Sequence, residues 1–251
     1  MAESRSGLRS DAWLRGDDEV ALEHRAALRP AGYRRGRQPL IGIASTASDL
    51  NRCDLGLRSL AAEVRRGVTE AGGLPLEFPV MSLSEDLMKP TAMLYRNLLA
   101  IEVEETIRSQ PLDGIVALGN CDKTVPAYLM ALASADVPGL IVTGGFRSVV
   151  TFDGASLGSG TSLWRLYDAR RSGSLSARDW SRLETCLGSG LGACNTMGTA
   201  STMAIMAEAA PSSPPPPPAP RSHIRIFHHL LAALELLRTL TPPNWGGKCP
   251  Q

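Results

Sequence analysis

The stretch that decides the fold runs from residue 114 to residue 145 and reads GIVALGNCDKTVPAYLMALASADVPGLIVTGG. The apolar runs GIVALG (114–119) and LIVTGG (140–145) are typical of buried strands. Between them, VPAYLMALASAD (125–136) predicts a helix that opens at Val125. A strand, a helix and a strand at this spacing predict two parallel strands joined by a helical crossover.

The sequence before this stretch continues the same alternation. Strands are predicted at LIGIAS (40–45) and LPLEFPVM (74–81), and helices over residues 55–71 and 93–109. The chain is therefore predicted to form an α/β fold, with helices packed on a parallel sheet. Residues 146–174 are rich in Gly, Ser and Arg and are predicted to be more loop-like than the rest.

Composition excludes several classes of protein. The chain has 251 residues, of which 43% are hydrophobic and 20% charged, which is ordinary for a soluble globular protein. Its net charge of +1 indicates neither a nucleic acid nor a membrane surface as partner. The sequence has no apolar run long enough to span a membrane, and its first residues lack the hydrophobic core of a signal peptide. We therefore expect a cytoplasmic protein.

Three parts are predicted along the chain. Residues 1–38 are polar and Arg-rich and are predicted to form an N-terminal arm. Residues 39–210 contain all the strands and helices of the α/β domain. Residues 211–251 open with PSSPPPPPAP, through which a helix cannot continue, and are predicted to be a separate Pro-rich tail.

Three of the five cysteines sit on loops beside predicted strand or helix ends: Cys53 in DLNRCDL, Cys121 in GNCDKT and Cys194 in GACNTMG. They are too widely spaced for a zinc-binding CxxC pattern. A single such cysteine is more often a small buried hydrophobe. Three of them leave a structural role and a shared site equally open, and three thiolates can hold an iron–sulfur cluster with one iron position free.

Carboxylates accompany these thiols. Asp122 follows Cys121 directly, and Glu85 and Asp86 follow the second predicted strand. Such hard oxygen ligands suit Mg²⁺. Glu85 can equally complement a helix dipole, and Lys123 can be a solvated surface cation. Beside a divalent ion an ammonium is unfavourable, so Lys123 in such a site would be neutral or chemically modified.

Motifs of other enzyme classes are missing from the sequence. It has no GxGxxG after a strand, no GxxxxGK[ST] and no HExxH. None of its four histidines lies in the predicted sheet region, which argues against a histidine-based triad.

Several segments resemble one known family, in the same order. Residues 119–145 closely resemble the CDKT-x-PA-x-LMA segment of the dihydroxy-acid and phosphogluconate dehydratase family, and residues 189–209 are similar to its third-cysteine motif. CNTMGTAS (194–201) and GSGTSLW (158–164) look most like the sugar-acid branch, the arabinonate or xylonate (pentonate) dehydratases. The likeness extends from residue 9 to about residue 210.

The resemblance implies a fold and a reaction. The N-terminal domain of the family is a parallel α/β sheet with helices on both faces, and its C-terminal β-rich domain is absent from this chain. The implied reaction is the dehydration of a 2,3-dihydroxy acid, such as a pentonate, to a 2-keto-3-deoxy acid by a hydro-lyase. The implied cofactors are a [2Fe-2S] cluster, or alternatively [4Fe-4S], and Mg²⁺. A small-molecule sugar acid is the implied partner, and the complete protein is expected to form a homo-oligomer, a dimer or a tetramer.

The resemblance also implies roles for particular residues. The iron–sulfur ligands it implies are Cys53, Cys121 and Cys194, and the magnesium ligands are Glu85, Asp122 and a carbamylated Lys123. Thr124 is expected to contact substrate. The base of the family is a serine of the C-terminal domain, so no catalytic residue is expected here. In this scheme the open iron assists departure of the C3 hydroxyl, and Mg²⁺ stabilises the enolate that forms as the C2 proton leaves.

The sequence departs from the family pattern in two places. Family members often have His shortly after the first cysteine, whereas DLGLRSL follows Cys53 here. The likeness ends near residue 210, and a frameshift or an aberrant gene end is one hypothesis for the Pro-rich tail. We therefore expect low activity. Two alternatives remain: a truncated, non-catalytic α/β module that binds a metal or a partner, and a dihydroxy-acid dehydratase of branched-chain amino acid synthesis.

Overall fold

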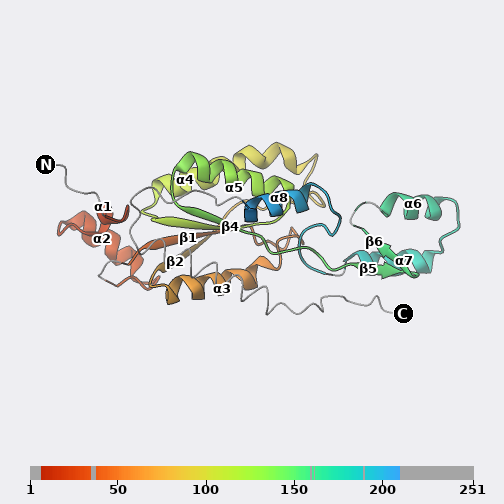
Figure 1. Cartoon of the computed structure of the whole chain (residues 1–251), viewed down its shortest axis with the longest axis horizontal. Helices are drawn as coiled ribbons and strands as arrows, with labels where there is room; N and C mark the ends of the chain where they lie inside the picture. The colour runs from red at the N-terminus through yellow and green to blue at the C-terminus, as the bar shows by residue number, and fades with distance from the viewer. Residues whose placement is uncertain (1–6, 35–37, 159, 161, 189, 210–251) are drawn as a thin grey trace.

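A four-stranded parallel sheet forms the centre of the molecule (Figure 1). The computed structural model describes residues 7–34, 38–158, 160, 162–188 and 190–209. The strands are β1 (Leu40–Ser45), β2 (Leu74–Pro79), β3 (Gly114–Leu118) and β4 (Gly139–Val142), in the order β2-β1-β3-β4. Ser45 of β1 is in register with Pro79 of β2 and with Leu118 of β3, so these strands end together at one edge. The prediction of a parallel α/β sheet is confirmed.

Helices cover both faces of the sheet. Helix α3 (Leu57–Glu70) packs on one face, and α4 (Arg96–Ser109), α5 (Cys121–Ala135) and α8 (Thr199–Ala209) lie on the other (Figure 1). Every residue of the central strands β1 and β3 is buried, as expected for strands covered on both sides. A separate apolar cluster fills each face, one around α3 and one around α4 and α5.

Helix α5 begins earlier than the predicted opening at Val125. Asn120 is extended and Cys121 is already the first helical residue, although its φ of 71° lies in the left-handed region. A helix that opened at Val125 would have Pro126 in its first turn, where the missing N–H leaves no hydrogen bond unmade. The helix instead includes Pro126 as an internal residue. As a result, Cys121, Asp122 and Lys123 all belong to the first turn of α5.

The prediction of a loop over residues 146–174 was wrong in part. Strands β5 (Val150–Phe152) and β6 (Ala155–Leu157) form an antiparallel hairpin, and α6 (Leu163–Arg171) follows. Asp153 and Gly154 connect the two strands, both with positive φ, which is the Asp-Gly turn that suits the twist of a hairpin. The hairpin, α6 and α7 (Ala177–Gly188) share a small apolar cluster of their own. We call this part, residues 150–188, the hairpin unit.

The described part of the N-terminal arm packs on the sheet domain. It contains α1 (Asp11–Leu14) and α2 (Glu19–Leu28), and a 3-10 helix, η1 (Ala92–Tyr95), precedes α4. The Arg9 guanidinium donates to four carbonyl oxygens at and after the end of α4: those of Ile107, Arg108, Gln110 and Leu112. These hydrogen bonds cap a helix end whose carbonyls would otherwise lack partners.

Two further observations concern the boundaries of the fold. The predicted Pro-rich tail, residues 211–251, lies outside the described residues, so its separation from the domain stays a prediction. Over the ranges that the structure describes, no helix is both long enough and apolar enough to cross a membrane.

Candidate functional site

The site lies at the edge where β1 and β3 end. The chain leaves β1 toward α3 on one face and leaves β3 toward α5 on the other, so the two connections diverge. In open α/β sheets this divergence opens a crevice in which ligands bind. Cys53 lies in the connection after β1, and Cys121 opens the helix after β3. The topology thus places two of the predicted ligands at one crevice.

A backbone pairing brings the third cysteine to the same place. Ala193 donates its N–H to the carbonyl of Gly145 at 2.9 Å, and Arg147 donates its N–H to the carbonyl of Ala193 at 2.8 Å. Gly192 makes this approach possible, because its φ is 114° and a Cβ there would lie 2.8 Å from the Gly145 oxygen. Cys194 therefore lies just beyond the end of β4.

The three thiols interact directly. The side chain of Cys121 is hydrogen-bonded to that of Cys53 and to that of Cys194. Cys53 is buried, and the other two thiols are partly buried. The hydrogen bonds to its neighbours, with burial, raise the pKa of Cys121, so this thiol keeps its proton. The same hydrogen bonds lower the pKa of Cys53, and that of Cys194 to about 6, with Arg147 assisting both shifts.

Asn120 ties together the connections that follow three of the parallel strands. Its side-chain NH₂ donates to the carbonyl of Cys53 at 2.7 Å, and its side-chain oxygen accepts from the N–H of Gly144 at 2.9 Å. One buried amide therefore links the connections that follow β1, β3 and β4. These bonds fix the relative positions of the loops independently of any metal.

Asp54 gives a second link at the same edge. Its carboxylate accepts from the N–H of Asn120 at 3.2 Å, the hydroxyl of Thr46 at 2.7 Å and the side chain of Asn51 at 3.0 Å. Asp54 is fully buried, and this burial raises its pKa from 3.8 to about 7 despite these donors.

The predicted magnesium ligands meet around one lysine. The Lys123 ammonium lies 2.9 Å from the Glu85 carboxylate and 3.1 Å from the Asp122 carboxylate. Thr199, at the start of α8, donates its hydroxyl to Asp122 at 2.5 Å. Burial opposes both charges, but the hydrogen bonds from Thr199 and Lys123 lower the pKa of Asp122, and those to Glu85 and Asp122 raise the pKa of Lys123. The lysine side chain is thus a cation held between two carboxylates.

The chemistry of both donor sets fits the cofactors that the resemblance implies. Three thiols from three segments distant in the chain converge beside a buried guanidinium, which suits an anionic thiolate-bound cluster. The carboxylates of Glu85 and Asp122 already hold a cation between them. In the part of the chain that the structure describes, no group of three or more His, Cys, Asp or Glu side chains has the geometry to hold a metal ion. The three thiols contact one another in a row, so they must move apart to bind a cluster. The third magnesium ligand would be a lysine, so the Lys123 side chain must also move for Mg²⁺ to bind.

Thr124, the predicted substrate contact, belongs to α5 and is fully buried. Its hydroxyl has no hydrogen-bond partner among the described residues. Its methyl group lies close to Gly119, where an added Cβ would approach it to 2.5 Å. A substrate contact of Thr124 stays a prediction, and burial of the side chain does not favour it.

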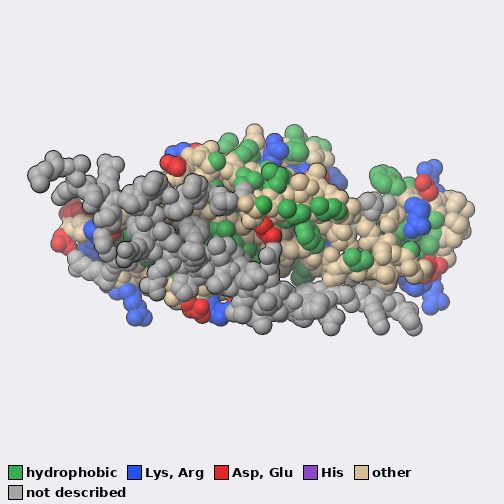
Figure 2. Space-filling view, in the orientation of Figure 1, with side chains coloured by type: hydrophobic (Ala, Val, Ile, Leu, Met, Phe, Trp, Pro, Cys, Tyr) green, Lys and Arg blue, Asp and Glu red, His purple; other side chains and the backbone are tan. Residues whose placement is uncertain are grey.

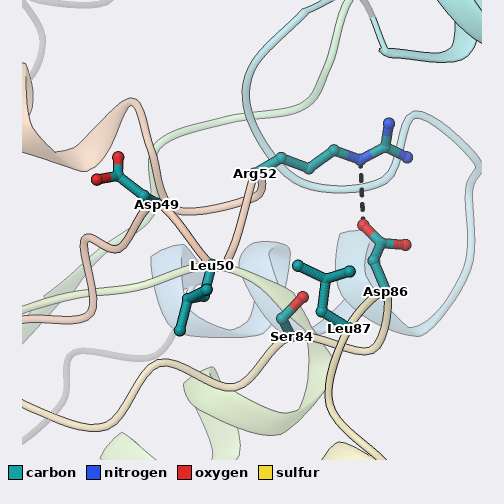
Figure 3. A pocket seen from close by; sticks show the side chains of 6 residues that line it. All are labelled: Asp49, Leu50, Arg52, Ser84, Asp86 and Leu87. Atoms are coloured by element: carbon teal, nitrogen blue, oxygen red, sulfur yellow. Dashed lines mark hydrogen bonds and ion pairs between the residues drawn. The ribbon is translucent and has the colours of Figure 1, made fainter.

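A pocket of about 350 Å³ opens next to the predicted cluster and magnesium ligands. It is lined by Asp49, Leu50, Arg52, Ser84, Asp86 and Leu87 (Figure 3). The Nε of Arg52 donates to Asp86 at 3.1 Å, and Nη1 donates to the carbonyl of Leu187 in α7 at 2.6 Å. Because Arg52 precedes Cys53 and Asp86 follows Glu85, the pocket adjoins both predicted ligand sets.

Sequence reasoning missed four residues that organise this site: Asp54, Asn120, Arg147 and Thr199. Asn120 had a usable signal, since it directly precedes the helix, where Asn is a preferred N-cap residue. Its side chain, however, bonds to other loops and makes no cap. Arg147 had no signal, because its partner Cys194 follows only after the whole hairpin unit.

Comparison with known families identifies the class of protein. Residues 38–216 match the family described as dihydroxy-acid/6-phosphogluconate dehydratase, N-terminal. The match covers more than half of the chain, and this protein therefore belongs to that family.

Individual relatives place the chain within the family. It is 48% identical to the L-arabinonate dehydratase of Rhizobium leguminosarum bv. trifolii, over 75% of this chain and 33% of the relative. It is 44% identical to the 6-deoxy-6-sulfo-D-gluconate dehydratase of Pseudomonas putida, over 78% and 34%. The dihydroxy-acid dehydratase of Koribacter versatilis is 35% identical, over 78% and 35%. The similarity to sugar-acid dehydratases is thus greater, and the chain spans about a third of the length of these relatives.

Proposed function

We propose that this chain is the cluster- and magnesium-binding part of a hydro-lyase that dehydrates a sugar acid, such as a pentonate, to a 2-keto-3-deoxy acid. The observation that carries the proposal is the convergence of Cys53, Cys121 and Cys194, which are far apart in sequence, into hydrogen-bonded contact at the switch point of the sheet. Greater identity to two sugar-acid dehydratases than to a dihydroxy-acid dehydratase supports the substrate class. The latter activity is the less favoured alternative.

The residues of this chain would form two cofactor-binding sites. Cys53, Cys121 and Cys194 would bind a [2Fe-2S] cluster, or alternatively a [4Fe-4S] cluster. Glu85, Asp122 and Lys123 would bind Mg²⁺, with Lys123 carbamylated. When bound, these groups would supply Lewis acids for the departing hydroxyl and for the substrate carboxylate.

The protein side chains prepare these sites before any cofactor binds. Thr199 orients the Asp122 carboxylate, and Asn120 holds the loop of Cys53 against that of Cys121. Carbamylation of Lys123 requires a neutral amine to attack CO₂ and to release a proton. The two carboxylates that surround the Lys123 ammonium raise its pKa and so oppose formation of the neutral amine. We therefore expect Lys123 to be modified only as a divalent cation replaces its charge.

Anaerobic reconstitution tests the cluster. With iron and sulfide supplied, we expect the protein to bind them in a ratio of about 2:2 and to become coloured. The Cys121→Ser variant should remain colourless, whereas Ser59→Ala, an exposed change on α3, should behave as the parent does. Failure of the parent protein to bind iron and sulfide would remove the cofactor assignment.

Modification of Lys123 is tested by mass spectrometry and NMR. Incubation with ¹³C-labelled bicarbonate and Mg²⁺ should give a carbamate carbon signal that is absent from Lys123→Ala. The control Lys89→Ala should retain the signal, and a signal that persists in Lys123→Ala would contradict the assignment.

A second candidate function is a non-catalytic α/β module that binds a metal or a partner. Exposed large apolar side chains favour such a module, since Ile205 and Met206 of α8 are each about half exposed to solvent. The space-filling view shows hydrophobic side chains gathered over the region of α8 (Figure 2). Surfaces of this kind often bind other protein surfaces, which is also consistent with the expected homo-oligomer. Keto-acid formation from pentonates by the reconstituted chain would decide for the enzyme, and cluster binding without turnover would decide for the module.

A further inference from the structure

One arginine beside the thiols has no role in the function proposed above. Arg147 follows β4 and is 6% exposed. Its Nη2 lies 3.5 Å from Sγ of Cys194, and its Nε donates to the carbonyl of Ala193 at 3.4 Å. The backbone N–H of Arg147 donates to the same carbonyl at 2.8 Å. Two guanidinium contacts and one backbone hydrogen bond thus hold Arg147 against the segment that carries Cys194.

The charge of Arg147 requires an anion nearby. A guanidinium remains protonated in proteins, and a buried charge without a counter-charge is strongly unfavourable. Among the residues that the structure describes, no carboxylate forms an ion pair with Arg147. The groups of opposite charge that it can meet are therefore the thiolates of the cysteine site.

We propose that Arg147 is the counter-ion of the three-thiolate site, a positioning residue that stabilises the negative charge of whatever metal group the thiolates bind. The proposal deepens the proposed function, and its metal-ion test does not depend on a cluster. Arg147 does not contact substrate in this role. It acts through Cys194, which it both holds in place and neutralises.

The formal charges explain why a counter-ion is needed. Three thiolates around a divalent cation leave one net negative charge. A [2Fe-2S] core of two ferric ions and two sulfides with three thiolates also carries one net negative charge, and one-electron reduction adds another. A fixed positive charge therefore stabilises both complexes, and it stabilises the reduced cluster more than the oxidised one. Loss of that charge should weaken metal binding and make the cluster harder to reduce.

Cadmium binding tests the proposal without the cluster. Cd²⁺ binds thiolates, and its thiolate charge-transfer absorbance can be followed during competition with a chelator. We expect Arg147→Gln to raise the dissociation constant for Cd²⁺ about tenfold, a change of about 1.4 kcal/mol. Arg147→Lys keeps the charge and should stay within about threefold of the parent. Arg65→Gln, on the surface of α3, is the matched control and should leave the affinity unchanged.

The reduction potential is the second measurement, because a merely structural residue would not shift it in a charge-dependent way. In the reconstituted protein, Arg147→Gln should lower the midpoint potential by about 59 mV, equivalent to a tenfold change in the one-electron equilibrium. Arg147→Lys should restore most of the shift.

Each outcome decides the proposal. It is overturned if Arg147→Gln matches the parent in Cd²⁺ affinity and potential, or if Arg147→Lys is as impaired as Arg147→Gln. If Arg147→Gln does not fold, Arg147→Lys decides: retained Cd²⁺ affinity supports the counter-ion, and a tenfold loss overturns it. If the parent binds Cd²⁺ but no cluster, the proposed cofactor fails while the cadmium comparison still tests Arg147.

Discussion

Cys121 occupies backbone that a non-glycine residue seldom adopts. Its φ of 71° is left-handed, and the residue nevertheless begins a helix. Such a conformation costs about 1–2 kcal/mol for a residue with a Cβ. Strain of this kind gathers at functional sites, where the surrounding structure imposes it. Here the conformation places the thiol between those of Cys53 and Cys194.

The strain at Cys121 leads to a stability prediction. We expect Cys121→Gly to be more stable than Cys121→Ala by about 1 kcal/mol, because glycine adopts positive φ without a steric cost. Urea unfolding of the metal-free variants gives the two free energies. Both variants should fail to bind a cluster, which makes them a matched pair. Equal stability, or a more stable alanine variant, would show that the backbone at this position is not strained.

Asp54 gives the protein a pH-dependent stability. Its pKa is about 7 in the folded protein and 3.8 ordinarily, so between these values the folded state binds a proton that the unfolded state lacks. Stability therefore falls as pH rises through this window, by at most about 1.4 kcal/mol per pH unit, and levels off above about pH 7. We expect Asp54→Asn to remove this contribution from the free energy of unfolding of the metal-free protein.

The parent and Asp54→Asn must be compared, because titration of Cys194 changes stability with pH in the opposite direction. Its pKa is lowered from 9.0 to about 6, so its contribution to stability rises with pH above about 6. The difference between the parent and Asp54→Asn isolates the aspartate. Asp49→Asn, an exposed change in the same loop, serves as the control. A difference that does not change with pH would rule out titration of Asp54 in this range.

At the scale of elements, two short segments decide whether the third cysteine reaches the site. The chain after β4 pairs with the chain before α8 through Gly145, Arg147 and Ala193. Neither segment is a regular strand, and each is held by two backbone hydrogen bonds. Gly192 permits this approach because it has no Cβ.

Substitution of Gly192 tests the pairing. We expect Gly192→Ala to destabilise the protein by about 1–3 kcal/mol, because the new methyl group meets backbone that cannot move aside. Displacement of Cys194 should also weaken Cd²⁺ binding by the thiols. Gly188→Ala, at the end of α7, adds a methyl group in open space and should leave both measurements unchanged. Parent-like Cd²⁺ affinity in Gly192→Ala would mean that Cys194 reaches the site by another route.

At the scale of the whole molecule, the hairpin unit has particular hydrogen bonds to the sheet domain among the residues that the structure describes. It has its own apolar cluster, and Arg52 donates from the sheet domain to the carbonyl of Leu187 at the end of α7. Asn195 adds a hydrogen bond to the carbonyl of Leu157. The unit can therefore open locally without unfolding the sheet.

Removal of the Arg52 link should show this independence. We expect Arg52→Ala to speed hydrogen exchange at least about tenfold in α6 and α7, since one hydrogen bond to a charged group contributes roughly 1.5–3 kcal/mol. Exchange in α4 should not change. The control Arg58→Ala removes an exposed pair with Asp49 and should alter neither region. Equal acceleration in α4 and α7 would contradict local opening.

Much of this protein follows from the sequence by itself. The apolar runs at 40–45 and 114–119 identify strands buried on both faces. Their alternation with helical stretches predicts a parallel sheet. The three cysteine motifs and their order also identify the family that the comparison confirms. Short-range patterns are sufficient for these features, because periodicity and motif order are properties of neighbouring residues.

Only the tertiary structure decides how the site is assembled. Which face each helix covers, and hence the switch point between β1 and β3, depends on topology. The contact of Cys194 with Arg147 depends on a backbone pairing across the hairpin unit. The cation shared by Glu85 and Asp122 depends on the loop of Glu85 meeting the first turn of α5. These contacts join residues distant in the chain, and no local pattern encodes them. The sequence thus determines which residue types are available as ligands, and tertiary packing determines which of these side chains come into contact.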